Sequence, residues 1–97
     1  MKESEIETYL RDEVIKRGGK AFKFSSPGNN GVPDRAVILP GIETVYVELK
    51  KPGKKLTRFQ QWRKNQFEKL GAKVYVIDSK ELVDKMMNSL EVKAHDL

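Results

Sequence analysis

Residues 34–50 read DRAVILPGIETVYVELK, two apolar segments joined by the turn pair Pro40-Gly41. Within residues 43–50 the side chains alternate, so that an extended chain would show valine and leucine on one face and tyrosine, glutamate and lysine on the other. Alternating segments around a Pro-Gly turn are typical of a β-hairpin. We therefore expect two antiparallel strands, at residues 34–39 and 43–50.

The segment after the hairpin predicts a helix and a further strand. Thr57 begins the pattern Thr-x-x-Gln with Gln60, which is the signature of a capping box at a helix N-terminus. The helix should run over residues 58–70 and end at Gly71, and residues 73–78 should form the next strand. A strand, helix, strand order implies a right-handed crossover and a parallel strand pair.

Working outward to the two ends of the chain, apolar residues at helical spacing precede the pair Gly18-Gly19, where a helix C-terminus belongs. The remaining elements are expected as a helix over residues 3–17, a strand over 20–26 and a final helix over 80–90. The fold class is thus α/β: a small mixed β-sheet flanked by helices, in the order α-β-β-β-α-β with a last helix, forming one domain over residues 1–97.

Two helical faces carry expectations about packing. We expect the apolar side chains of the second helix to face the core rather than to stack on bases; these are Phe59, Trp62, Phe67 and Leu70. The exposed face of the last helix, with Met86 and Met87, is a candidate dimer surface, and the alternative is that both methionines belong to the core.

Composition narrows the chemistry that the chain can perform. It has 97 residues, 38% of them hydrophobic, with no cysteine and one histidine. Thiolate catalysis, cysteine-bound zinc and Ser-His-Asp catalysis are excluded or implausible, which leaves carboxylates, lysines and oxygen-ligated cations such as Mg²⁺ or Mn²⁺. The net charge of +5 suits a polyanionic partner. No apolar run approaches a membrane span and the N-terminus carries acids, so we expect a soluble, cytoplasmic protein.

The residues best placed for chemistry are Asp34, Glu48 and Lys50. If Asp34 opens one strand of the hairpin and Glu48 lies near the end of the other, their carboxylates meet at one end of the sheet, with Lys50 on the same face as Glu48. Two converging carboxylates repel, and a divalent cation with oxygen ligands neutralises them. The alternative is that all three are ordinary strand and turn residues facing solvent.

A basic segment follows this constellation. Five positive charges gather just past Lys50, at Lys51, Lys54, Lys55, Arg58 and Arg63. Phosphate contacts supply most of the sequence-independent affinity for DNA, so we favour a DNA-contacting role over a solubilising charge run. The Gly- and Asn-rich loop at residues 25–31 could follow the DNA backbone through its main-chain amides.

The strings GVPDR at residues 31–35, VELK at 47–50 and LTRFQ at 56–60 resemble the VRR-NUC domain of the PD-(D/E)XK nuclease superfamily, in particular its short stand-alone viral and bacterial members. The resemblance extends from the first helix to about residue 79. It implies a restriction-endonuclease-like core and divalent-metal-dependent DNA cleavage.

The same resemblance assigns roles to single residues. It implies that Asp34, Glu48 and the backbone carbonyl of Leu49 bind the metal, that Lys50 is the catalytic lysine, and that Gln60 belongs to a further family motif, although the capping box alone would explain this glutamine.

The family pattern also places an acid on the first helix. We favour Glu7 for this position, with Glu3 as the rival and a helix-dipole acid as the alternative for both. Arg35 follows the first site acid and could contact phosphate, pair with a site carboxylate, or simply be solvated.

These observations predict a Mg²⁺- or Mn²⁺-dependent deoxyribonuclease in which metal-activated water attacks the phosphodiester in line, without a covalent enzyme intermediate. The resemblance further implies a homodimer that cuts branched DNA such as a Holliday junction. One rival is a non-catalytic nucleic-acid-binding module on the same fold. Another is a metal-free structural or regulatory domain, which would show neither a magnesium effect on stability nor salt-dependent DNA affinity.

Overall fold

A computed structural model describes residues 1–95 of the chain. Over this range the elements follow in the order α1 (Glu3–Lys16), β1 (Lys20–Lys23), β2 (Arg35–Leu39), β3 (Ile42–Leu49), α2 (Arg58–Lys69), β4 (Val74–Ile77) and α3 (Lys80–His95). This is the predicted order of helices and strands.

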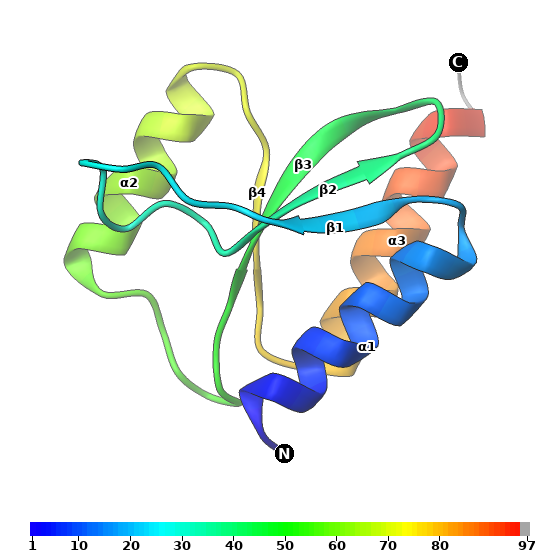
Figure 1. Cartoon of the computed structure of the whole chain (residues 1–97), viewed down its shortest axis with the longest axis horizontal. Coiled ribbons are helices and arrows are strands. Elements are labelled where there is room, and N and C mark those ends of the chain that lie inside the picture. Colours follow the sequence, from blue (N-terminus) through cyan, green and yellow to red (C-terminus); the bar gives the residue numbers. More distant parts are fainter. Residues whose placement is uncertain (96–97) are drawn as a thin grey trace.

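The strands form one mixed sheet in the order β1-β2-β3-β4 (Figure 1). The pairs β1/β2 and β2/β3 are antiparallel, whereas β3 and β4 run parallel, with α2 as the crossover between them. The hairpin register places Arg35 opposite Val47, and the parallel register places Glu48 opposite Val76. The mixed sheet and the parallel pair expected from the sequence are both confirmed.

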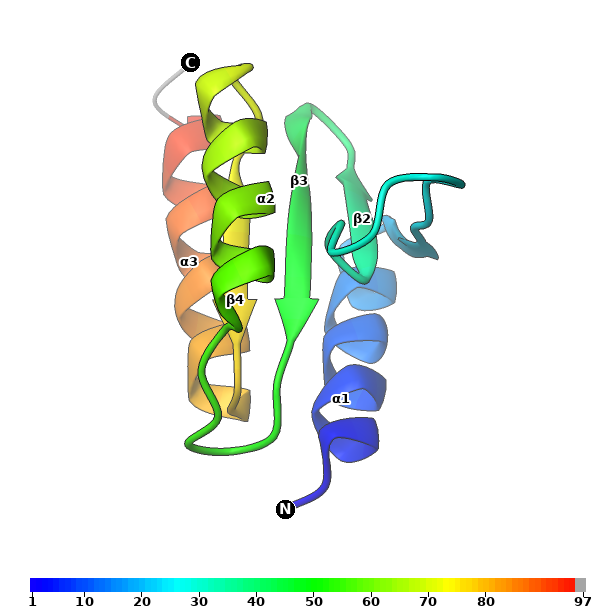
Figure 2. The ribbon, with the colours of Figure 1, turned by 90° about the vertical axis from the view of Figure 1, so that its left-hand side faces the viewer.

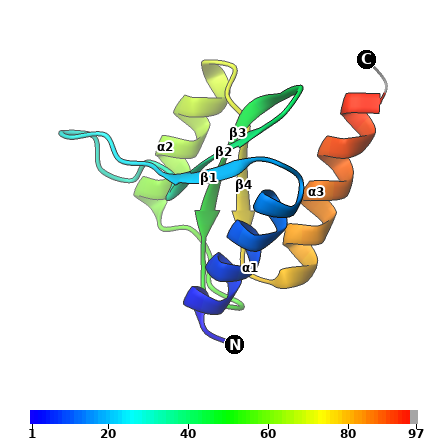
Figure 3. The same ribbon diagram turned by 45° about the vertical axis from the view of Figure 1, so that its right-hand side comes forward.

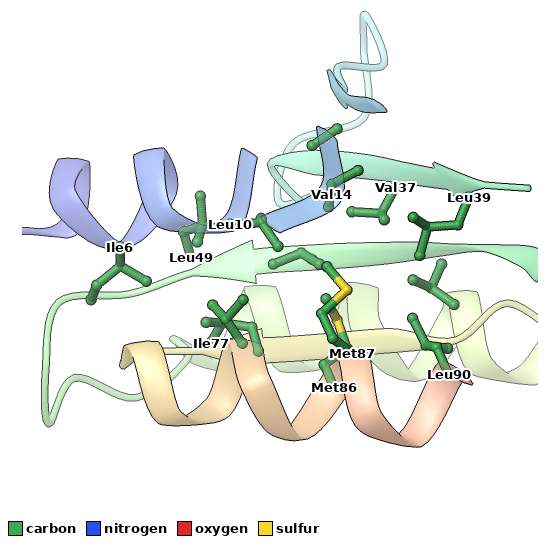
Figure 4. Packing of buried hydrophobic residues seen from close by; sticks show 14 residues of the cluster. Ile6, Leu10, Val14, Val37, Leu39, Leu49, Ile77, Met86, Met87 and Leu90 are labelled. Carbon is green, nitrogen blue, oxygen red and sulfur yellow. The ribbon is translucent and has the colours of Figure 1, made fainter. Parts of the chain in front are cut away.

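Helices cover both faces of the sheet, α1 and α3 on one face and α2 on the other (Figures 1 and 3). The main core lies between the sheet and the α1/α3 layer, where α1 supplies Ile6, Leu10 and Val14 (Figure 4). From the sheet, Val47 and Leu49 point into this core. The alternation of β3 therefore sends Glu48 to the opposite face, toward α2.

The α2 face has a smaller aromatic cluster in place of an aliphatic core. Tyr46 of β3 packs edge-on against Phe67 of α2 at 5.3 Å between ring centroids, and Phe24 lies 5.1 Å from Tyr46 and 6.1 Å from Phe67. Edge-to-face aromatic pairs add to the stabilisation from burial alone. These three rings attach α2 to the sheet above the end of the hairpin.

Local signals explain where two helices begin and end. Gly18 follows the last turn of α1 with φ of 82°, a conformation that only glycine adopts at little cost, and its N–H donates to Ile15 O at 2.9 Å. At the start of α2, the Gln60 N–H donates to Thr57 Oγ1 at 3.1 Å and the Thr57 N–H donates to Gln60 Oε1 at 3.0 Å. The predicted capping box is confirmed.

Several boundaries and faces differ from the expectations. The first strand ends at Lys23 rather than at residue 26, and the last helix continues to His95. Met86 and Met87 are buried in the core, so the expectation of an exposed dimer surface there is wrong and the core alternative is correct. Within residues 1–95, each helix is too short or too polar to cross a bilayer.

The expectation that the second helix buries its large apolar side chains is also wrong for three of four residues. Phe59 is 47% exposed, Trp62 53% and Leu70 82%, and only Phe67 packs toward the sheet. The physical reason is that α2 lies on a narrow aromatic cluster rather than on a broad apolar surface. The Phe67 ring alone fills that contact, and the rings of Phe59 and Trp62 stay exposed to solvent.

Candidate active site

The hairpin brings two acids together at one end of the sheet. Asp34 lies immediately before β2, and Glu48 is the penultimate residue of β3. Because the register pairs Arg35 with Val47, Asp34 and Glu48 lie at the same end of neighbouring strands. The Leu49 N–H donates to Asp34 Oδ2 at 2.8 Å, which fixes the Asp34 carboxylate against β3.

Glu48 is an acid held in an environment that disfavours its charge. Glu48 is only 5% exposed. Burial raises the pKa of Glu48 to about 9, and the hydrogen bond and negative charge of Asp34 act in the same direction, with a smaller contribution from Glu3, while the ammonium of Lys50 opposes the rise. The two carboxyl groups therefore cannot both ionise cheaply without an added positive charge.

Lys50 follows the last residue of β3 and is half-buried. Its backbone N–H donates to Ile77 O at 2.9 Å, so the residue is anchored to β4 on the side away from the hairpin. Its charge is felt by Glu48, as the pKa effect shows. Lys50 therefore follows the end of β3 that carries Glu48, and its positive charge favours the ionised form of that acid.

Glu7 reaches the site from α1 but is engaged by Arg35. Arg35 Nη2 lies 3.0 Å from Glu7 Oε2, Arg35 Nε donates to the same oxygen at 3.2 Å, and Arg35 Nη1 donates to Ala21 O at 3.2 Å. Arg35 is 7% exposed. Of the roles considered for this arginine, the pairing with a site carboxylate is the one observed, and its burial contradicts both the solvated reading and a direct contact to DNA.

A pocket of about 340 Å³ joins Glu7 and Asp34. Lys23, Phe24 and Ser25 complete its lining. Asp34 therefore faces Glu7 across this pocket and also neighbours Glu48 on the strand beside it. In the part of the chain that the structure describes, no group of three or more His, Cys, Asp or Glu side chains lies close enough together to hold a metal ion.

The chemistry of the donor set nevertheless fits a hard divalent cation. Asp34 and Glu48 offer carboxylate oxygens at the same end of adjacent strands, and the pKa of Glu48 is raised by burial and by the neighbouring Asp34. Carboxylate oxygens are the ligands that hard divalent cations prefer. Glu7 would join them only by giving up part of its ion pair with Arg35. The structure thus brings the three predicted acids together in pairs rather than as one cluster.

Gln60 stands at the start of α2, where its Oε1 serves the capping box. The expected capping role is therefore present, and a catalytic role for its amide stays a prediction. The basic residues beyond it divide into two groups. Arg63 is buried and donates to Asn30 O at 2.9 Å, so it is a structural residue rather than the DNA contact we expected.

The other basic residues line the surface beside the site. Lys51, Lys54, Lys55 and Arg58 are all exposed. The last three, with Lys64, line a groove of about 540 Å³ between the lysine-rich loop, α2 and Val76 of β4. The groove is positively charged, and Val76 in its lining is the register partner of Glu48 on the neighbouring strand. Such a groove suits a phosphate backbone.

Sequence reasoning left one feature of the site undecided and missed another. The ion pair between Glu7 and Arg35 was one of three roles open for the arginine, and no local pattern selects it because the two residues are far apart in the chain. The exposed, stacked rings of Phe59 and Trp62 were assigned to the core, although the two residues between them, Gln60 and Gln61, are polar.

Comparison with known proteins places these residues in context. No family model matches the chain. A protein described as "Putative nuclease p44", from Acyrthosiphon pisum secondary endosymbiont phage 1, is 46% identical over 82 residues, which cover 84% of this chain and 88% of that protein. A solved structure described as "VRR_NUC domain" superposes with a TM-score of 0.82 at 33% identity, covering 89% of this chain and 94% of the other.

Proposed function

The chain belongs to the VRR-NUC nuclease family, and from this membership we propose that it is a DNA endonuclease that hydrolyses phosphodiester bonds with Mg²⁺ or Mn²⁺. The observation that carries the proposal is the pairing of Asp34 with the buried Glu48, with the ammonium of Lys50 beside them. Two neighbouring acids that do not ionise together easily are suited to binding a cation. The basic groove nearby is suited to binding a polyanion.

Asp34 and Glu48 would hold the cation, with the backbone carbonyl of Leu49, the residue after Glu48, as a further oxygen ligand. When bound, the cation supplies Lewis-acid stabilisation of phosphoryl charge and lowers the pKa of water. We retain Glu7 as the acid contributed by α1, because it lines the same pocket as Asp34. Glu3 remains its rival, because its charge acts on Glu48.

The chain's own groups would perform the remaining tasks. Lys50 would orient the attacking water and stabilise the negative charge that develops on the phosphoryl oxygens. Gln60 is proposed to contact the substrate through its amide nitrogen, since its Oε1 caps α2. Lys51, Lys54, Lys55 and Arg58 would bind backbone phosphates on either side of the cut.

We propose further that the enzyme acts on branched DNA as a homodimer. A two-fold dimer would present two equivalent sites to a two-fold substrate such as a four-way junction.

The second candidate is a nucleic-acid-binding module without catalysis. The ion pair that engages Glu7 favours it, because that acid is not free to bind a cation while Arg35 holds it. The intact set of Asp34, Glu48 and Lys50 favours the nuclease.

The test is cleavage of a fluorescent four-way junction, a linear duplex and a single strand by the purified protein. Each DNA is incubated with Mg²⁺, with Mn²⁺ and with EDTA. A nuclease cuts at least one DNA only when metal is present, and a junction preference supports the proposed substrate. A protein that binds all three DNAs and cuts none with either metal is the binding module, and sedimentation of the protein alone tests the dimer.

A further inference from the structure

The side of α2 next to the loop at residues 25–33 carries two large exposed rings. Phe59 is 47% exposed and Trp62 53%, and their rings stack with centroids 5.7 Å apart and planes inclined by 12°. Neither ring belongs to the hydrophobic core. Two adjoining exposed aromatic side chains form a surface that water covers poorly, and such surfaces mark binding sites.

Arg63 holds the two rings in place. Its guanidinium carbon lies 5.5 Å from the Phe59 ring centroid and 4.8 Å from that of Trp62. The same guanidinium donates to Asn30 O at 2.9 Å and to Gln66 Oε1 at 2.7 Å, and the residue is only 8% exposed. An arginine tied at both ends fixes the rings before any ligand arrives, which lowers the entropy cost of binding.

The rings are also joined to the active site through the loop. Gly31 has φ of 79°, and a Cβ on it would lie 3.0 Å from Phe59 Cδ2, so the backbone of the loop touches the Phe59 ring. Gly31 precedes Asp34 by three residues, a span of at most about 11 Å. Figures 1 and 2 show the loop running past α2 to the start of β2. The two rings and the site acids are therefore separated by no more than the length of a few nucleotides.

Charge indicates what covers the rings. Arg58 lies one turn before Trp62 and Lys69 two turns after it, so positive side chains flank the rings along the helix. Glu68, the acid of α2, forms an ion pair with Lys64 instead. A second copy of a chain with net charge +5 would bring like charges together here, whereas a nucleic acid would bring phosphates to the cations and bases to the rings.

We propose that Phe59 and Trp62 form a stacking platform for unpaired bases of the DNA strand that enters the active site. The substrate then carries a single-stranded segment beside the phosphodiester that is cut, because bases inside a duplex are already stacked and cannot reach a protein ring. The inference rests on the proposed function and narrows its substrate class: among branched DNAs it favours those with an unpaired segment, such as a flap, over a fully paired four-way junction. Phe59 and Trp62 are positioning residues, and they do not take part in the chemistry.

The chain's single tryptophan is Trp62, so its fluorescence reports directly on the platform. The protein is titrated in EDTA, where no cleavage occurs, with a single-stranded oligonucleotide and with an abasic strand of equal length and charge. We expect quenching by the first strand and little by the second, with a dissociation constant weaker by roughly 5- to 150-fold for the abasic strand. Equal affinity and equal quenching would overturn the proposal without any variant being made.

Variants then test the two rings separately from the phosphate contacts. Trp62→Ala and Phe59→Ala should each weaken binding of a labelled single strand, measured by anisotropy, by at least about 5-fold. Trp62→Phe should restore most of the affinity. Leu70→Ala is the matched control, since Leu70 is 82% exposed at the end of the same helix and lies outside the stack. Unchanged binding in the two alanine variants, or an equal loss in Leu70→Ala, would refute the platform.

Cleavage assays separate this inference from the proposed function. If the wild type quenches with single strands and cuts nothing, the platform stands and the nuclease proposal fails. If it cuts fully paired and partly unpaired DNA at equal rates, and Trp62→Ala does the same, the platform fails and the nuclease proposal stands. Sedimentation tests whether a second copy of the chain covers the rings instead. If the wild type is a dimer, and Trp62→Ala is a monomer with unchanged single-strand affinity, the rings are a dimer contact and the proposal is overturned.

Discussion

The carboxyl pair at the end of the hairpin predicts that Asp34→Asn stabilises the metal-free protein at alkaline pH. The asparagine keeps an oxygen that can accept from the Leu49 N–H, which donates to Asp34 Oδ2 at 2.8 Å, but removes a negative charge beside buried Glu48. Among the charged groups that act on Glu48, Asp34 and Glu3 raise its pKa and Lys50 lowers it. Only the Asp34 contribution is lost in the variant.

The sign of the effect follows from the shift at Glu48. Its folded-state pKa of about 9 lies above the ordinary value of 4.5, so the folded protein binds more protons than the unfolded chain between these two values. The contribution of Glu48 to the free energy of unfolding is therefore fully present below about pH 4.5 and is lost as the pH rises toward 9. Burial is the main cause of the shift, and Asp34 comes second.

The size of the effect can be bounded from the same shift. Each pKa unit corresponds to about 1.4 kcal/mol. Asp34 is not the main cause of the rise from 4.5 to about 9, so its replacement should recover only part of the penalty, on the order of 1–3 kcal/mol at pH 8. For a domain of this length, that raises the Tm by about 4–8 °C for each kcal/mol.

The assay is thermal unfolding in EDTA between pH 5 and pH 9, followed by circular dichroism. Asp34→Asn should show a weaker loss of Tm with rising pH than the wild type and should lose cleavage activity. Glu43→Gln, a carboxylate-to-amide change at an exposed position of β3, should leave the pH dependence unchanged. An Asp34→Asn protein that is less stable than the wild type at pH 8 would refute the reasoning.

Three further changes test other parts of the molecule. Arg35→Met leaves Glu7 without its partner and should lower the free energy of unfolding by roughly 1–3 kcal/mol. The loss is smaller than for a fully buried ion pair because the Glu7 side chain is 33% exposed; an unchanged urea midpoint would contradict the ion pair. Thr57→Ala removes the cap of α2 and should cost about 1 kcal/mol, whereas Thr57→Ser should cost little, again by urea unfolding. Lys54→Ala combined with Lys55→Ala should make the negative slope of log affinity against log salt for duplex DNA shallower by about 2. An unchanged slope would show that these lysines do not contact the DNA.

Local patterns predicted the elements that local forces determine. The alternation in residues 43–50 predicted both β3 and the burial of Val47 and Leu49, because one residue in two must face the core. The Thr-x-x-Gln pattern predicted the cap of α2, because Thr57 and Gln60 bond only to each other's backbone. These signals need no knowledge of the rest of the fold.

Features that depend on distant partners escaped the sequence. The spacing of Phe59, Trp62 and Phe67 suggested an apolar helix face, but only the aromatic pair under α2 decides which ring is covered, and it covers Phe67. For Arg35 the sequence left a phosphate contact, a pairing with a site carboxylate and a solvated side chain open, and the structure pairs it with Glu7. That pairing arises because α1 packs on the sheet that contains β2, and neither segment alone contains any sign of it.

The convergence of Asp34 and Glu48 falls between these two cases. The hairpin register follows from the turn and the alternation, so the sequence could place both acids at the same end of the sheet. The burial of Glu48 depends on tertiary packing around the end of β3, and the raised pKa follows mainly from that burial. Sequence reasoning could therefore locate the acids but not their electrostatic state.

The central claim is that Lys50, beside the paired acids, takes part in metal-dependent hydrolysis of DNA. The measurement that tests it most directly is the single-turnover rate of DNA cleavage in Mn²⁺ or Mg²⁺ for Lys50→Ala and for Lys51→Ala, its exposed neighbour, with DNA affinity measured in EDTA. The account predicts that Lys50→Ala cuts at least about 100-fold more slowly, a loss typical of one lost charge-stabilising group, while Lys51→Ala cuts at nearly the wild-type rate. Equal rates for the two variants at saturating DNA would contradict it.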